Sequence, residues 1–300
     1  MTTADLIRDA ILLSMMLLVI SLGLRTGAGD AGYLFRRPPL LIRSVLAMNI
    51  IMPVVAIWLV TVFDLRPSVK VALVALSVSP VPPFLPDKQL KLTQSQGYVY
   101  GLLVSSAVLA IVLVPATGAI LQHLVARRGG ADSMEHTVTL GRILQIVGLT
   151  VLLPLGIGIL ARHRWPERAV RLAAPLSKAG SVLLVLALVP VLLSQWPAIR
   201  SLIGDGTLLA IIVFTALGLG IGHSLGGTDP QNRTVLALAT AARHPAVALA
   251  VASAVFPDQK LAPAAVLLAL LVGTLASIPY SSWRGKLLRR ATPSKASTAI

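Results

Sequence analysis

The sequence predicts an all-α polytopic membrane protein with about nine transmembrane helices. Of its 300 residues, 56% are hydrophobic and only 12% are charged, and the mean hydropathy is +0.85. A soluble globular domain carries about 25% charged residues, so this composition argues against a soluble enzyme or binding domain. No polar stretch is long enough for a separate soluble domain. We therefore predict one membrane domain, residues 1–283, followed by a basic cytoplasmic tail at 284–300.

Nine apolar segments, each long enough to cross a bilayer, carry the prediction of nine spans. They are residues 6–24, 40–63, 68–86, 95–122, 138–161, 175–195, 203–222, 234–256 and 262–283. The first is expected to be a span and not a signal peptide, because two Asp and one Arg precede its apolar run, Ile11–Ile20, whereas signal peptides begin with positive charge. Whether the third segment crosses the membrane fully is left open.

The charge distribution predicts the orientation in the membrane. The net charge of +15 comes from 26 Lys and Arg against 11 Asp and Glu. Nucleic acid is not the expected partner, because the basic residues are scattered through short loops. Cytoplasmic loops of membrane proteins are rich in Lys and Arg, and most of these residues lie inside if the N-terminus is extracytoplasmic and the C-terminus cytoplasmic. The expected location is the plasma membrane (bacterial inner membrane), with the lipid bilayer as partner and the oligomeric state undetermined.

Two of the apolar segments contain prolines that interrupt a continuous helix, since proline lacks the backbone donor that a helix interior needs. These prolines are Pro80, Pro82, Pro83 and Pro86 in the third segment and Pro245 in the eighth. We predict a helix break in each segment. A pair of interrupted segments at matching positions in the two halves of a membrane protein points to a transporter binding site.

The two interrupted segments also align with each other. PSVKVALVALSVSPVPP, from residue 67, aligns with PQNRTVLALATAARHPA, from residue 230, so that Ser77 falls on Thr240 and Pro82 on Pro245. Because the step from segment three to segment eight is five spans, an odd number, the two copies would run antiparallel. This predicts inverted-topology repeats at about 6–122 and 175–283, each with one broken helix. Chance alignment of apolar sequences is the alternative.

Arg243 is the only charged residue between Val235 and Phe256. Placing Arg at the middle of a bilayer costs about 2.5–3.5 kcal/mol on insertion scales. A charge beside a helix break, at one membrane depth, indicates a functional site. Arg243 either belongs to a ligand or ion region or satisfies carbonyl groups that the break leaves free.

Other polar residues near the breaks are His244, Thr240, Ser77, Ser79 and Asn49. His244 either titrates, which makes proton coupling conceivable, or is a neutral hydrogen-bond partner. The three hydroxyls either line the breaks or bond the carbonyl of the preceding turn. Asn49 either meets the crossing or joins two helices. The histidines lack metal-ligand spacing and no enzyme motif is present, so neither a metal site nor catalysis is predicted.

The first span and its exit carry a specific pattern. In LLSMMLLVISLGLRTGAGDAGYLFRRPPLLIRSVLAMNIIMPVVA, residues 15–24, 36–38 and 48–53 match the signature MFGMGL…RRP…MP. On these residues the chain resembles the bile acid:sodium symporter family. Auxin-efflux-type and sodium/proton-antiporter-like transporters remain alternatives. The resemblance implies ten helices, or nine without the first, as is expected here.

The resemblance also implies how the helices are grouped. Segments two to four and seven to nine would form a core bundle in which the broken helices cross, and segments one, five and six would form a panel. Substrate would bind between core and panel, with sodium ions beside the crossing.

The chain departs from that family where sodium ligands are expected. The resemblance places a Glu at Ala239, a Gln at Arg243 and another Gln at Met48, and a hydroxyl and an amide at residues 85–86. All eleven acidic residues lie in loops or at span ends, and a guanidinium repels a cation. Sodium is thus expected from the family but disfavoured by these residues, and no other cofactor is expected.

The sequence therefore predicts a secondary transporter that moves a small organic anion by alternating access, without the ordinary sodium site. Arg243 would replace sodium as a fixed charge, or bind a carboxylate or sulfonate of the anion. The alternative is a membrane sensor or scaffold that keeps the fold without transporting. The substrate, the coupling ion and the direction of transport are not predicted.

Overall fold

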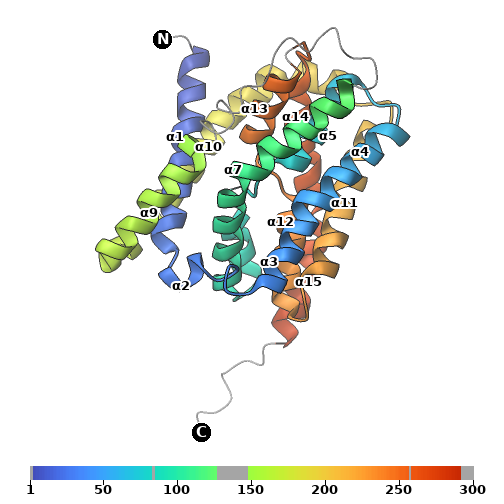
Figure 1. The fold of residues 1–300 in the computed structure, drawn as a ribbon. Coiled ribbons are helices and arrows are strands. Elements are labelled where there is room, and N and C mark those ends of the chain that lie inside the picture. The colour runs from blue at the N-terminus through green and yellow to red at the C-terminus, as the bar shows by residue number, and fades with distance from the viewer. Residues whose placement is uncertain (1–2, 83–84, 127–147, 257, 292–300) are drawn as a thin grey trace.

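The described part of the computed structural model, residues 3–82, 85–126, 148–256 and 258–291, consists of helices and their connections, with no strand (Figure 1). The helices are α1 (Thr3–Arg25), α2 (Ala28–Ala31), α3 (Pro38–Val45), α4 (Met52–Val62), α5 (Pro67–Val78), α6 (Leu85–Leu92), α7 (Gln96–Ala126), α9 (Leu153–Arg164), α10 (Pro166–Ser201), α11 (Thr207–Leu225), α12 (Pro230–Ala241), α13 (Pro245–Val255), α14 (Ala262–Ala276) and α15 (Ile278–Ala291), with π-helical turns η1 (Leu46–Ile51) and η3 (Gly148–Leu152). The predicted all-α class is confirmed.

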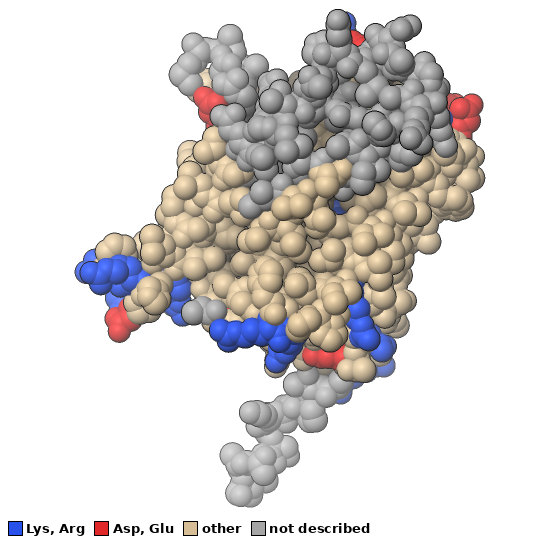
Figure 2. Space-filling model, viewed as in Figure 1, with Lys and Arg blue, Asp and Glu red and all other residues tan. Residues whose placement is uncertain are grey.

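Within these ranges, four stretches are long and apolar enough to cross a membrane: Pro38–Val62, Pro166–Ser201, Thr207–Leu225 and Ala262–Arg290. Figure 2 shows a broad uncharged surface, with Lys and Arg gathered toward the end of the molecule where α15 emerges. The protein is therefore an integral membrane protein. The start of the fifth predicted segment, residues 138–147, lies outside the described residues, so the count of nine spans stays a prediction.

Three helices, α1, α9 and α10, pack chiefly on one another and form a group at one side of the molecule, here called the panel (Figure 1). The contact between α1 and α9 is close because glycines meet there. A Cβ atom on Gly23 would lie 2.6 Å from the carbonyl oxygen of Leu155, and one on Gly158 would lie 2.5 Å from that of Ile20. The remaining helices form the core group, which the panel contacts through packing of α10 on α14.

Two helices of the core group are broken. The first halves, α5 and α12, both contain 12 residues, begin with proline and end in an extended residue, Ser79 or Ala242. Each first half contacts the second half of the other broken helix, since α5 packs on α13 and α12 on α6. The two broken helices therefore cross at their breaks, as the family resemblance implied. Their inverted-topology relation stays a prediction.

The prolines are placed differently from the prediction. Pro80 and Pro82 lie in the first break, but Pro86 is the second residue of α6 and Pro245 the first of α13. Proline is tolerated in the first turn of a helix, where its missing donor would have no intrahelical partner. These two prolines begin the second half-helices instead of interrupting the first. Pro83 lies outside the described residues.

The predicted tail begins inside α15, which continues to Ala291. Arg284 is buried there, and its Nε donates to the hydroxyl of Thr234 at 2.9 Å while Nη2 donates to the carbonyl oxygen of Pro230. Arg284 therefore joins α15 to the start of α12. Residues 292–300 lie outside the described part.

The contact between α11 and α12 depends on glycine, and this gives a test of the fold. A Cβ on Gly222 would lie 2.6 Å from the Cα of Ala237, whereas a Cβ on Gly220 of the same helix meets nothing within 4 Å. Gly222→Ala should destabilise the protein by about 1–3 kcal/mol through overpacking. Gly220→Ala should be neutral or slightly stabilising, because Ala favours helix over Gly. Thermal unfolding of the two purified variants checks this, and equal melting temperatures would contradict the described packing.

Candidate functional site at the helix crossing

The backbone joins the two breaks directly. The N–H of His244, the last residue of the second break, donates to the carbonyl oxygen of Pro80 in the first break at 2.9 Å. The N–H of Val81 donates to the hydroxyl of Ser106, on α7, at 3.1 Å. Helix ends leave backbone donors and acceptors without intrahelical partners. At this crossing, one backbone donor of the second break is paired with a carbonyl of the first break, and one backbone donor of the first break is paired with a side chain of α7.

Arg243 ties three segments of the core group together. Its Nη1 donates to the carbonyl oxygen of Ser79 at 3.1 Å, and its Nη2 to that of Met48 at 2.8 Å. Ser79 ends α5, so its carbonyl lacks a helical donor, and Met48 lies in the π-helical turn η1. Such turns often mark functional sites. The side chain is only 4% exposed, so the guanidinium is held inside the protein between two carbonyl oxygens.

Several buried polar atoms at the crossing have no hydrogen-bond partner. They are Nε of Arg243, both ring nitrogens of His244 and the hydroxyl oxygen of Thr240. His244 and Thr240 are at most 1% exposed. A buried donor or acceptor without a partner costs about 1–3 kcal/mol. The crossing therefore combines a buried positive charge with unused hydrogen-bonding capacity.

The remaining candidate residues, Ser77, Ser79 and Asn49, are not among the unpartnered polar groups of the crossing. Ser77 and Ser79 donate their hydroxyl protons to carbonyl oxygens of their own helix, those of Val74 and Ala75, at 2.7 and 2.8 Å. This is the alternative role considered for both residues. Asn49 follows Met48 in η1 and is partly exposed, so Arg243 reaches the backbone next to it. Sequence reasoning missed Ser106, because a lone hydroxyl on an apolar helix carries no signal of what it caps.

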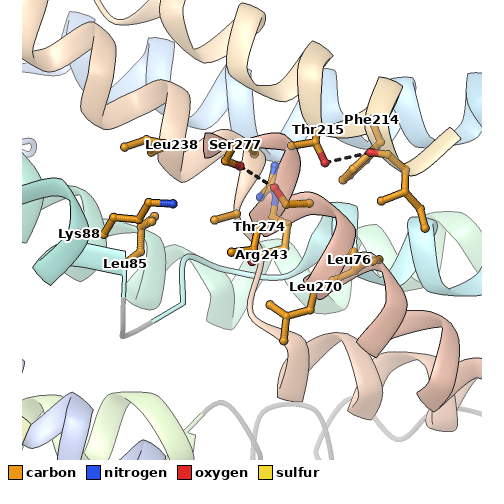
Figure 3. A pocket seen from close by; sticks show the side chains of 15 residues that line it. Leu76, Leu85, Lys88, Phe214, Thr215, Leu238, Arg243, Leu270, Thr274 and Ser277 are labelled. Atoms are coloured by element: carbon orange, nitrogen blue, oxygen red, sulfur yellow. Dashed lines mark hydrogen bonds between the residues drawn. The ribbon is translucent and has the colours of Figure 1, made fainter. Parts of the chain in front are cut away.

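Two cavities border α14. The larger, of about 470 Å³, lies between the panel and the core group, and its lining includes Leu188 of α10 and Leu249 of α13. The smaller, of about 190 Å³, lies within the core group and is lined by Arg243 of the crossing and by Lys88 of α6 (Figure 3). Lys88 belongs to the polar stretch that follows the third apolar segment, a composition typical of a solvated loop. It lies instead on a helix, half-buried beside the crossing.

Comparison with known families identifies the chain. No curated protein matches it. The family model described as the Sodium Bile acid symporter family matches residues 10–197, more than half of the chain. The match includes η1 and the first break but ends before the second break, which carries Arg243. Members of this family are transporters and not enzymes. On this match, the chain belongs to the sodium bile acid symporter family.

Proposed function

We propose that the chain is a secondary transporter of a small organic anion that works by alternating access, with no sodium ion at the helix crossing. Membership of a transporter family supports the general function. The observation that carries the finer proposal is the position of Arg243, whose guanidinium donates to the carbonyl oxygens of Ser79 and Met48.

These two carbonyl oxygens are the kind of ligand that a sodium ion needs. In transporters with broken helices, unwound backbone carbonyls and half-helix C-terminal ends coordinate the cation. Here the carbonyls of Ser79 and Met48 already accept from a guanidinium, which also repels a nearby cation in a medium of low dielectric constant. The described residues therefore do not fit a sodium ion at this place, and the mechanism includes no sodium step there.

The cavity between the panel and the core group suits the body of an organic anion. Its lining is mainly aliphatic, with Gln195 and Thr274 among the few polar side chains. Binding sites for organic molecules are typically apolar clefts with a few placed polar groups. The panel helices contact each other much more than they contact the core group. Rocking of one group against the other would open this cavity to either side of the membrane.

The arrangement of charge supports the proposed orientation. The Lys and Arg side chains of α15 and of the turn between α9 and α10 lie toward one end of the molecule (Figure 2). Cytoplasmic ends of membrane helices are enriched in these residues. We place this end in the cytoplasm, which gives a cytoplasmic C-terminus and an extracytoplasmic N-terminus in the plasma membrane or bacterial inner membrane.

Reconstitution tests the proposed function. Purified protein in proteoliposomes should take up radiolabelled organic anions, with taurocholate, a sulfonate, and small carboxylates as probes. Uptake should be equal in sodium and in choline buffers, because no sodium step is involved. Uptake that requires sodium would contradict the sodium-free mechanism. Folded protein that moves none of the probes would instead support the sensor or scaffold alternative.

Arg243→Gln tests whether the guanidinium holds the crossing. The variant should unfold more easily by about 1–3 kcal/mol, because one neutral amide cannot satisfy two buried carbonyl groups. The melting temperature of the purified protein measures the effect. Arg200→Gln is the control, since Arg200 is exposed at the end of α10 and its loss should change little. Equal stability of Arg243→Gln and the parent would show that the guanidinium does not stabilise the crossing.

A double variant tests the place of sodium directly. Ala239→Glu with Arg243→Gln restores the carboxylate and amide that the family resemblance implies and frees the carbonyls of Ser79 and Met48. Because a ligand that binds only the folded state raises its stability, sodium should raise the melting temperature of this variant and leave the parent unchanged. Potassium at equal ionic strength is the control. A sodium effect of equal size in both proteins would count against the proposal.

A further inference from the structure

The smaller cavity is lined by two cationic side chains, three hydroxyl side chains and otherwise apolar residues. It is lined by residues of α5, α6, α11, α12 and α14, among them Leu76, Phe214 and Leu238. Lys88 enters from α6 and Arg243 from the second break, and Figure 3 shows the Lys88 ammonium directed toward the side where Arg243 and Ser277 lie. Among the described side chains that line this cavity, none is a carboxylate.

Two hydroxyls of the cavity already donate hydrogen bonds to backbone carbonyl oxygens. The hydroxyls of Thr215 and Ser277 donate to the carbonyl oxygens of Ile211 and Gly273, at 2.9 and 2.7 Å. Both terminal nitrogens of Arg243 donate to carbonyl oxygens across the crossing, whereas its Nε is buried without a partner. Three donors at the cavity have no hydrogen-bond partner among the described residues: the Thr274 hydroxyl, the Lys88 ammonium and Nε of Arg243, the last of which is fully buried.

A buried charge without a counter-charge is costly, and dipoles offset only part of this cost. Carbonyl dipoles stabilise Arg243, but they carry no net negative charge. A second cation at the same cavity adds repulsion between like charges. A bound anion beside Lys88 would offset that repulsion and accept a charge-assisted hydrogen bond from the ammonium, which is about twice as strong as a neutral one.

We propose that this chamber, the Lys88–Arg243 cavity, binds a small monovalent anion, either a carboxylate group or a halide ion. Its volume of about 190 Å³ suits a compact charged group, while the cavity between the panel and the core group has about 470 Å³. Leu270 and Thr274 of α14 border both cavities. We place the charged group of a transported organic anion by Lys88 in this cavity, an assignment that rests on the proposed function.

Lys88→Gln tests the cavity without disturbing the crossing, because Lys88 makes none of the contacts that join the breaks. In purified protein, acetate and chloride should each raise the melting temperature of the parent in a saturable manner. In Lys88→Gln, the apparent dissociation constants should rise about tenfold or more, through loss of one charge-assisted hydrogen bond. Lys91→Gln, on the exposed face of the same helix, should behave like the parent. Equal anion dependence in the parent and Lys88→Gln, or no saturable effect in the parent, overturns the proposal.

Uptake into proteoliposomes distinguishes the two sources of the anion. If the charged group of the substrate occupies the cavity, acetate should compete with uptake and Lys88→Gln should raise the KM for the organic anion with little change in kcat. If a free halide occupies it, chloride should stimulate uptake without competing. Anion-dependent stabilisation without any uptake would support the cavity and contradict the transport function. Uptake that is unaffected by Lys88→Gln, acetate and chloride would support the transport function and contradict anion binding in the cavity.

Discussion

The structure depends on one constraint: backbone groups released by a helix break inside a membrane must find partners within the protein, because lipid offers none. Two breaks at the same depth double the number of such groups. Crossing the breaks meets part of the need, through the bond from His244 to Pro80, and Ser106 meets another part. The remaining carbonyls of Ser79 and Met48 are met by one side chain, that of Arg243. Its charge and its fork of donors let it serve both at once.

The same constraint explains what could be predicted from the sequence. Pro67 and Pro230 mark aligned starts of α5 and α12, because proline favours the first turn of a helix and the apolar run after it defines the span. Arg243 was detectable because a charge in an apolar stretch is rare. Its partners were not, since backbone carbonyls leave no trace in a sequence, and Met48 lies 195 residues away in a π-helical turn.

Charged residues near span ends were the hardest to place. Lys88 and Arg284 lie in polar sequence that resembles solvated loop or tail, yet Lys88 lines a cavity and Arg284 is buried against α12. In both cases the helix continues beyond the apolar run, and its direction decides which face meets the protein. Local composition indicates where a span ends, but it does not indicate which way the following turns point.

A guanidinium is covalently attached, so the charge at the crossing of this protein can neither leave nor be replaced during a transport cycle. In a carrier with a dissociable ion at that place, a concentration gradient of the ion supplies free energy to the cargo. A carrier that moves a monovalent anion with a permanent charge there, and with no companion ion, transfers one net negative charge in each cycle. Electrical potential then acts on the cargo by about 2.3 kcal/mol per 100 mV. For the sodium-free anion transport proposed above, a negative interior would favour efflux, so the fixed charge of Arg243 would bear on the direction of net flow as well as on the fold.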